Sequence, residues 1–181
     1  GDGVTYRTLP GTHPDKGAFF TRGSSKDEFA RYTEDGQAYV RNMKRLEKKW
    51  DTIKSNVPTS DISLDPDHNK AILYFGTTIY SAEEALDILK EHDLHYNWIR
   101  IKSFPFGPEV IDFINRHEEI FVIEQNRDAQ MRSLLINELE VAPSKLKKVL
   151  NYDGMAITAE QISMSIKEAT IFMDHSTPEM F

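Results

Sequence analysis

The chain has two parts with different patterns of hydrophobic and polar residues. From Lys70 to Ala169, short apolar runs alternate with segments in which apolar residues recur every three or four positions. Short apolar runs with polar or glycine boundaries are typical of buried strands, and the longer period is typical of helices. The pattern predicts strands at 70–76, 96–104, 119–124 and 146–154, and helices at 81–92, 107–117, 128–139 and 158–169.

Strand and helix in regular alternation are typical of a doubly wound α/β sheet. We expect three layers, with a mostly parallel sheet of about four to five strands between two layers of helices. The spacing of apolar residues also predicts which side of each helix faces the sheet. The expected inward residues are Ala82, Ala85, Leu86, Leu89, Val110, Phe113, Ile114, Met131, Leu134, Leu135, Leu139, Ile162, Ser165, Ile166 and Ala169.

Several helix starts can be read from capping residues. Ser81 with Glu84, and Thr158 with Gln161, have the spacing of a capping box, in which each side chain bonds the backbone of the other residue. Pro108 suits a first helical turn. Asp128 is a suitable cap for the helix that follows it.

Residues 1–69, which precede the alternating strands and helices, have a different composition and pattern. Residues 1–35 are rich in Gly, Pro, Thr and charge, which predicts an irregular arm that needs a larger body to lie on. A helix is expected from Asp35 to about Ser55, with Tyr39, Met43, Leu46 and Trp50 on one face. Its basic face, which holds Arg41, Lys44, Arg45, Lys48 and Lys49, is interpreted as solvated. Residues 55–69 resemble a polar linker, so the expected domains are 1–57, the arm and linking helix, and 58–181, the α/β part.

Functional residues of doubly wound sheets lie at the carboxyl ends of the strands. Three such edges are expected here: Gly76–Thr78, Ser103–Gly107 and Glu124–Asp128. The first has no G-x-G-x-x-G pattern, and the sequence has no P-loop pattern, so dinucleotide and P-loop chemistry lack support.

Glu124 stands at the end of an apolar run, where a carboxylate could act as a general base. The interpretation we prefer is structural: Asp128 caps the next helix, and Glu124 and Arg127 pair or hydrogen-bond locally. Asn126 tolerates left-handed backbone, so it also has a structural explanation.

Composition narrows the possible functions. The 181 residues carry a formal net charge of −7 and no cysteine. Disulfides, thiolate nucleophiles and cysteine ligands for an iron–sulfur cluster are therefore excluded within this sequence. The acidic balance argues against nucleic acid and anionic membrane as partners. No apolar run is long enough for a transmembrane helix, and His92 and His95 lack a third ligand at metal spacing, so we expect a cytoplasmic chain without a metal site.

Four segments together resemble one family: "YRTLPGTHPDKGAFFTRGSSKDEFARYTED" (6–35), "IKSFPFGPEVIDFI" (101–114), "VIEQNRDAQMRSLL" (122–135) and "LNYDGMAIT" (150–158). They are similar to the C-terminal, transketolase-C-terminal-like region of the alpha subunit of 2-oxoacid:ferredoxin oxidoreductases, of the 2-oxoglutarate type. The resemblance implies an enzyme complex that converts a 2-oxoacid and coenzyme A to acyl-CoA and CO2 while it reduces ferredoxin.

The resemblance also implies where the cofactors are. Thiamine diphosphate, Mg²⁺ and an iron–sulfur cluster are expected in the full complex, on the beta subunit, and none in this chain. The expected partners are the beta subunit and the remainder of the alpha subunit, with ferredoxin and coenzyme A bound through the complex. The chain itself is expected to be an inactive, structural docking domain, and a piece of a longer protein or a separately encoded part.

No residue is carried over as catalytic, cofactor-binding or metal-binding. The resemblance implies that Arg7, Thr12, His13 and Arg22 approach the substrate entrance or a partner subunit, although packing of the arm is an equal alternative. Family members often have Asp-Gly-Gln where this chain has Asp128-Ala129-Gln130, and alanine there predicts a regular helix. The alternative function is a free-standing α/β module that binds a small anionic ligand. The residues expected at a subunit or substrate edge are Arg7, Thr12, His13, Arg22, Glu124, Asn126 and Arg127.

Overall fold

The computed structural model describes residues 1–6, 8–17 and 26–174, the last four of these by their backbone only. The chain forms two compact units, Gly1–Val57 and Pro58–Phe181. Each unit is built by a different kind of sequence.

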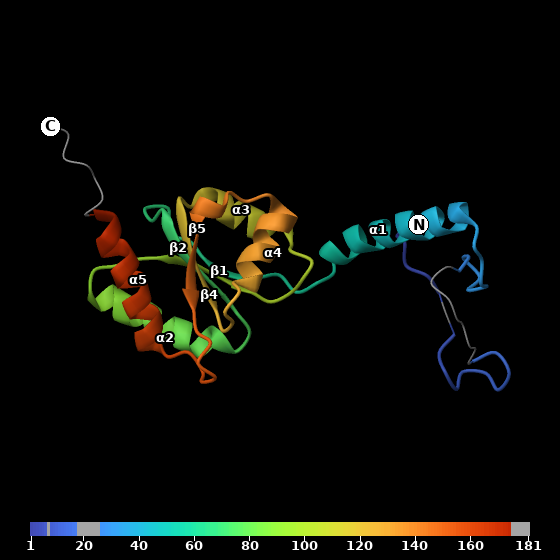
Figure 1. The fold of residues 1–181 in the computed structure, drawn as a ribbon, viewed down its shortest axis with the longest axis horizontal. Coiled ribbons are helices and arrows are strands. Elements are labelled where there is room, and N and C mark those ends of the chain that lie inside the picture. The colour runs from blue at the N-terminus through green and yellow to red at the C-terminus, as the bar shows by residue number, and fades with distance from the viewer. Residues whose placement is uncertain (7, 18–25, 175–181) are drawn as a thin grey trace. The chain divides into compact units, whose positions relative to one another are not determined.

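A five-stranded sheet forms the centre of the second unit (Figure 1). Its order is β1-β3-β2-β4-β5, and every neighbouring pair is parallel except β1 with β3. This confirms the mostly parallel α/β sheet expected from the alternating pattern. The strands are β1 (Asp61–Ser63), β2 (Lys70–Phe75), β3 (Asn97–Ile101), β4 (Glu119–Glu124) and β5 (Leu146–Leu150).

Helices cover both faces of the sheet and complete three layers (Figure 1). On one face lie α2 (Ile79–Glu91) and α5 (Ala159–Asp174), and on the other α3 (Pro108–Arg116) and α4 (Gln130–Leu139). Two short 3₁₀ helices, Gly76–Thr78 and Pro143–Lys145, precede α2 and β5.

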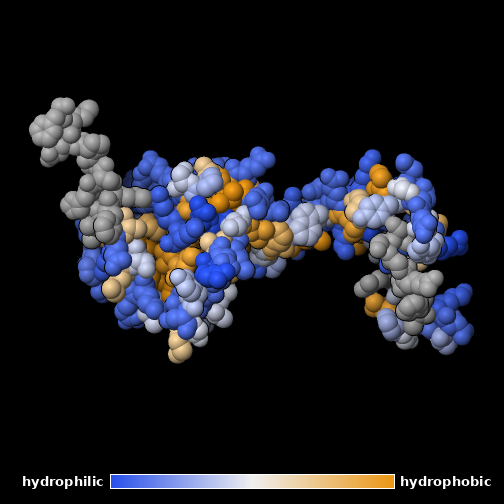
Figure 2. Space-filling model, in the orientation of Figure 1, coloured by the Kyte–Doolittle hydropathy of each residue, from blue (hydrophilic) through white to orange (hydrophobic). Residues whose placement is uncertain are grey.

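The core consists of two apolar clusters, one on each face of the sheet. Strand β4 shows how the sequence makes both: Ile120 and Val122 belong to the α3–α4 cluster, and Phe121 and Ile123 to the α2–α5 cluster. All six residues of β4 are buried, as expected for a central parallel strand with helices on both sides. Figure 2 shows apolar residues (orange) between α5 and α4, in the region of β4 and β5.

Most predicted helix faces are confirmed, with one exception on α5. Ile162 and Ile166 are fully buried, but Ser165 is exposed and Ser163 is buried in its place. The Ser165 hydroxyl donates to the Gln161 carbonyl oxygen at 2.8 Å, which satisfies it on the solvent side. The capping box of Thr158 and Gln161 is confirmed, because each side chain accepts the other residue's N–H.

Two predictions at element ends are wrong. Helix α2 begins two residues before Ser81, which therefore lies inside the helix and caps nothing. Its hydroxyl instead donates to the Ile157 carbonyl oxygen at 2.8 Å and joins α2 to the segment before α5. Strand β1 lies within the predicted linker, where Asp61 and Ser63 pair with Arg100 and Trp98 of β3.

The first unit consists of helix α1 (Gly36–Lys54) and the irregular arm before it. The Asp35 carboxylate caps α1 by accepting the N–H groups of Gln37 and Ala38. The start of the arm lies against α1: Gly3 has a φ of +81°, and a Cβ at this position would stand 2.5 Å from the Lys49 nitrogen. Among the described residues of this unit, Ala38 is the only buried apolar side chain.

Candidate functional site

The connection order of the sheet places its functional edge between β2 and β4. The chain goes from β2 to β3 on one side and then crosses to β4 on the other side of β2. Neighbouring parallel strands whose connections leave in opposite directions make a crevice at their carboxyl ends, where ligands and partners of such sheets bind. The segments after β2 and β4 are two of the three edges expected from the sequence.

A cavity of about 590 Å³ occupies this crevice. Its lining combines apolar side chains with hydroxyl and amide groups. Gly76 has a φ of +61° and no atom within 4 Å of an added Cβ, so glycine allows the turn. The lining residues are Phe75, Gly76, Thr77, Thr78, Gln125, Asn126, Gln130, Met131 and Leu134.

Glu124 lies beneath the cavity with a side chain that is fully buried. Its Oε2 accepts the Met131 N–H at 2.7 Å, and its Oε1 accepts the Arg132 N–H at 2.9 Å. The Asn126 side-chain amide donates to the same carboxylate at 2.8 Å. A negative charge that accepts N–H groups at a helix start is stabilised by those bonds and by the helix dipole. Glu124 is therefore the cap of α4.

The expected roles of Asp128 and Ala129 are wrong. Asp128 makes no cap; its exposed carboxylate accepts from Arg127 Nε at 2.8 Å, so Arg127 pairs with Asp128 and not with Glu124. Ala129 has left-handed backbone angles, φ 53° and ψ 53°, and does not continue a regular helix. This conformation is strained for alanine and free of strain for glycine.

Three residues predicted for a partner or substrate edge thus have different surroundings. The Glu124 side chain is fully buried, and its contact with a neighbouring subunit stays a prediction. Asn126 is partly buried, and its Oδ1 accepts the N–H groups of Asp128 and Gln130. Arg127 is exposed at the rim of the edge. Contact of Asn126 or Arg127 with a partner stays a prediction.

Gln125 is the residue that joins the parts of the edge, and sequence reasoning did not single it out. Its Nε2 donates to Thr78 Oγ1 at 3.1 Å, and its Oε1 accepts the Ile157 N–H at 3.3 Å. The side chain therefore connects the start of α2 with the loop between β5 and α5. The sequence feature that could have indicated Gln125 is its position directly after Glu124, at the carboxyl end of a strand.

A second cavity of about 510 Å³ lies on the other side of Gln125. It is lined by Gln125, Asn151, Tyr152, Gly154, Met155 and Ala156. Asn151 holds this loop by donating to the Met155 carbonyl oxygen at 2.8 Å. The third expected edge, Ser103–Gly107, lines neither cavity.

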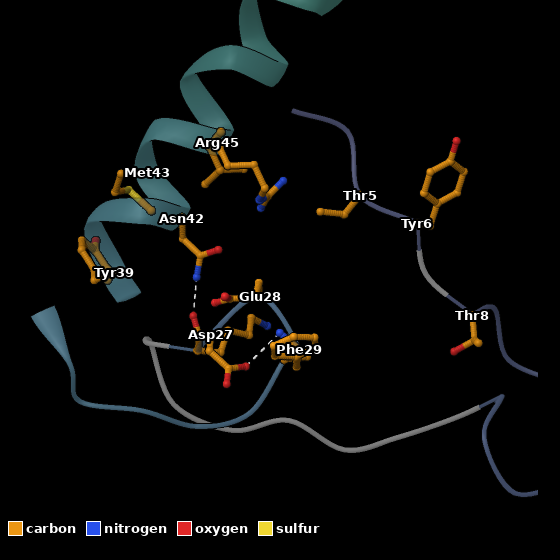
Figure 3. A pocket seen from close by; sticks show the side chains of 13 residues that line it. Thr5, Tyr6, Thr8, Asp27, Glu28, Phe29, Tyr39, Asn42, Met43 and Arg45 are labelled. Atoms are coloured by element: carbon orange, nitrogen blue, oxygen red, sulfur yellow. Dashed lines mark hydrogen bonds between the residues drawn. The ribbon is translucent and has the colours of Figure 1, made fainter. Parts of the chain in front are cut away.

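The first unit has a cavity of its own, of about 700 Å³ (Figure 3). Tyr39, Met43 and Arg45 of α1 stand on one side, and the turn that carries Asp27 and Phe29 closes another. The Asn42 side-chain amide donates to the Lys26 carbonyl oxygen, and Arg45 Nη1 donates to that of Gly3. These bonds hold the arm to α1.

Thr12 and His13, two of the four arm residues predicted from the resemblance, do not line this cavity. Thr12 and His13 are exposed, and among the described residues their side chains bond to nearby backbone: the Thr12 hydroxyl donates to the Leu9 carbonyl oxygen, and His13 Nδ1 accepts from the N–H groups of Asp15 and Lys16. Arg7 and Arg22 lie outside the described residues. Contact of any of the four with substrate or subunit stays a prediction.

Within the described part of the chain, no group of three or more acidic, histidine or cysteine side chains could hold a metal ion. No described helix is long and apolar enough to cross a membrane.

Comparison with solved structures identifies a similar fold. The chain superposes on a 2-oxoglutarate:ferredoxin oxidoreductase from Magnetococcus marinus, solved with 2-oxoglutarate, coenzyme A and succinyl-CoA, with a TM-score of 0.76 and 18% identity. The match covers 92% of this chain and 29% of that one, so the chain spans less than a third of the length of its structural relative. At this identity the similarity establishes the fold, not the activity.

Two further structures match less well. The alpha chain of a probable 2-oxoacid ferredoxin oxidoreductase from Thermoplasma acidophilum has a TM-score of 0.42 and 21% identity, over 61% of this chain and 96% of that one. A split-gene transketolase, an inactive β4 tetramer, has a TM-score of 0.47 and 17% identity, over 70% and 55% of the two chains. No protein-family model and no curated protein sequence matches this chain.

Proposed function

We propose that this chain is part of the alpha subunit of a thiamine-diphosphate-dependent 2-oxoacid:ferredoxin oxidoreductase, of the 2-oxoglutarate type. The complex would convert a 2-oxoacid and coenzyme A to acyl-CoA and CO2 and reduce ferredoxin. Within it, this chain is a structural domain that docks companion chains.

One observation carries the proposal. The superposition on the Magnetococcus marinus enzyme covers 92% of the chain, a share that the α/β unit alone cannot supply. It therefore extends into the arm and α1, a combination that a generic doubly wound sheet does not contain. The "YRTLPGTHPDKGAFFTRGSSKDEFARYTED" segment, part of the sequence resemblance, lies in that same arm.

The residues of this chain do not fit the cofactors of such a complex. A cysteine-held iron–sulfur cluster needs thiolate ligands, and the sequence has no cysteine. The described residues offer no cluster of metal ligands. Thiamine diphosphate, its Mg²⁺ and the iron–sulfur cluster would therefore be held by companion chains, and this chain would perform no chemical step.

Co-expression tests the proposal. The chain, with an affinity tag, should co-purify with the beta subunit and the rest of the alpha subunit. Alone, with thiamine diphosphate and Mg²⁺ added, it should not turn over 2-oxoglutarate. Turnover by the isolated chain, or a well-folded chain that binds no companion subunit, would contradict the proposal.

The alternative, a free-standing module for a small anionic ligand, has one observation in its favour, the cavity between the 76–78 and 124–128 segments. However, none of the described residues that line this cavity is a cation that could pair with an anion. A thermal-shift screen with phosphate, coenzyme A and 2-oxoacids would decide, because a ligand that binds the native state must raise its stability.

A further inference from the structure

We propose that the outer edge of β5 is a docking site, where an extended acidic segment of a partner protein adds to the sheet as a further strand. The inference goes beyond the proposed function, because β5 (Leu146–Leu150) lines neither of the cavities at the carboxyl edge. The occupant is a protein segment with carboxylate side chains at alternate positions.

The backbone of β5 is the first argument. The Asn151 N–H donates to the Glu124 carbonyl oxygen at 2.9 Å, so the odd-numbered residues of this parallel pair turn their backbone groups toward β4. The even-numbered residues of β5 turn theirs outward. At Lys148 and Leu150 these outward N–H and C=O groups have no hydrogen-bond partner among the described residues. Free groups of this kind are the template that a strand of another protein can join.

The free part of the edge has a defined beginning. At Leu146 the outward carbonyl oxygen accepts from Arg132 Nε at 2.8 Å, and the outward N–H donates to the Pro143 carbonyl oxygen. Arg132 Nη2 donates to the same Pro143 oxygen at 2.7 Å. An added strand can therefore pair with Lys148 and Leu150 but not with Leu146.

Three cations along this edge are the second argument. Lys148 lies on the same face of β5 as Leu146, the face toward α3 and α4, because side chains alternate along a strand. Arg132 belongs to α4, and the Lys145 ammonium group donates to the Ile114 carbonyl oxygen of α3 at 2.8 Å. In the part of the chain that the structure describes, none of these three cations forms an ion pair with a carboxylate. This is unusual in a chain with 29 acidic and 22 basic residues.

Two acidic side chains near the strand have other partners. On the opposite face of the sheet, Glu119 lies 3.8 Å from Lys147 and 3.5 Å from Lys70. After the strand, the Asp153 carboxylate accepts the Met155 N–H at 2.9 Å and so holds the loop before α5. Neither carboxylate pairs with a cation on the α3–α4 face, so that side of the edge keeps its positive charge.

These features define the partner. An extended segment would form main-chain hydrogen bonds with Lys148 and Leu150 and would place every second side chain beside Lys148. Carboxylates at these positions gain a favourable cross-strand contact, whereas basic side chains would be repelled. Binding should therefore need both a free backbone and negative charge, and should weaken as salt screens the exposed charges.

The experiment measures binding of fluorescent peptides to the full chain by fluorescence polarisation. A peptide of alternating Glu and Thr should bind, and Lys148→Glu in the chain should weaken this binding about tenfold. Lys90→Glu is the matched control, since Lys90 is an exposed lysine at the end of α2, in the other layer of helices, and should bind normally. The same peptide with methylated backbone nitrogens keeps its charge but cannot pair as a strand, so it should not bind. Unchanged thermal unfolding midpoints would show that both variants are folded.

Each alternative has its own result. Equal binding of the methylated peptide would show a contact through charge alone and would contradict strand addition. Equal binding to the Lys148→Glu chain, or tighter binding of a peptide of alternating Lys and Thr, would contradict the acidic partner. Failure of the Glu and Thr peptide to bind the unmodified chain would overturn the whole inference. Dimers in sedimentation that this peptide dissociates would replace the partner protein with a second copy of the chain.

Discussion

At the scale of single residues, Glu124 is the side chain whose removal should cost most at the edge of the sheet. Glu124→Ala leaves the Met131 and Arg132 N–H groups without acceptors in a buried place, so the free energy of unfolding should fall by about 2–4 kcal/mol. Asp128→Ala is the control, because that carboxylate is exposed and pairs with the exposed side chain of its neighbour Arg127. It should change stability by less than about 1 kcal/mol. Urea unfolding measures both, and equal losses would contradict the assignment of the cap.

Replacement of Tyr74 is expected to raise the free energy of unfolding rather than lower it. Its hydroxyl is buried and has no hydrogen-bond partner among the described residues, and burial raises its pKa to about 12. Tyr74→Phe removes this unsatisfied group and should raise the free energy of unfolding by about 1 kcal/mol. Tyr96→Phe is the matched control, since the Tyr96 hydroxyl lies 3.3 Å from Thr170 Oγ1 and should be neutral or slightly costly to remove. A loss of stability in Tyr74→Phe would show that its hydroxyl has a partner.

Residue roles were the hardest part to predict from sequence. Glu124, Asn126, Arg127 and Asp128 were recognised as a polar corner, but which carboxylate capped α4 depended on backbone direction. The left-handed angles of Ala129 turn the chain so that Glu124, six residues before the first residue of α4, reaches the free N–H groups of its first turn. Sequence rules for helix caps expect the capping side chain directly before the helix, so they do not predict a cap from Glu124.

At the scale of elements, a buried polar network joins β3, α3 and the segment before β2. The Asn97 side-chain amide donates to His117 Nε2 at 2.8 Å and to the backbone of Asp65 and His68. His117 Nδ1 lies 2.7 Å from the Phe113 carbonyl oxygen. These contacts fit a neutral imidazole that donates from Nδ1 and accepts at Nε2.

The network predicts a loss of stability in acid. Burial lowers the pKa of His117 below its ordinary value, and nearby Lys145 and Arg116 act in the same direction, while the Phe113 carbonyl opposes it. Because the folded pKa is below the unfolded one, the stabilising effect is complete above about pH 6.5 and is lost as the pH falls through the folded pKa. The slope from this one group cannot exceed about 1.4 kcal/mol per pH unit.

Unfolding at a series of pH values tests this, with His117→Gln as the comparison because glutamine does not titrate. The variant should be less stable at neutral pH and should lose less stability between about pH 6.5 and 5 than the unmodified chain. Parallel pH profiles would assign the acid sensitivity to other groups.

The longer strands and helices could be predicted from the sequence, because the apolar residues that give them their regular pattern are the ones that form the core. Ile72 and Tyr74 on one face of β2, and Ala71 and Leu73 on the other, make the apolar run that marks a central strand. Strand β1 was missed because it is a three-residue antiparallel edge strand within a polar segment. Its pairing depends on β3, which its own sequence does not reveal.

At the scale of the whole molecule, the two units differ in how they are stabilised. The α/β unit has a cluster of buried side chains on each face of its sheet, whereas Ala38 is the only buried apolar side chain described in the first unit. We expect limited proteolysis of the isolated chain to cut within 1–35 well before 70–169. Mass spectrometry of the fragments locates the cuts, and equal resistance of both regions would contradict this expectation. Addition of the companion subunits should protect the arm if the proposed function is correct.

The position of β5 has a consequence for solubility. It is an outer strand of the sheet, so one row of its backbone N–H and C=O groups has no neighbouring strand among the described residues. Such a row can recruit a strand from another molecule and start aggregation. Lys148 is exposed in the middle of β5, and its ammonium group repels an identical strand that approaches in register. Lys148, which interrupts the apolar pattern of β5, therefore helps to keep the chain from assembling on itself through this edge.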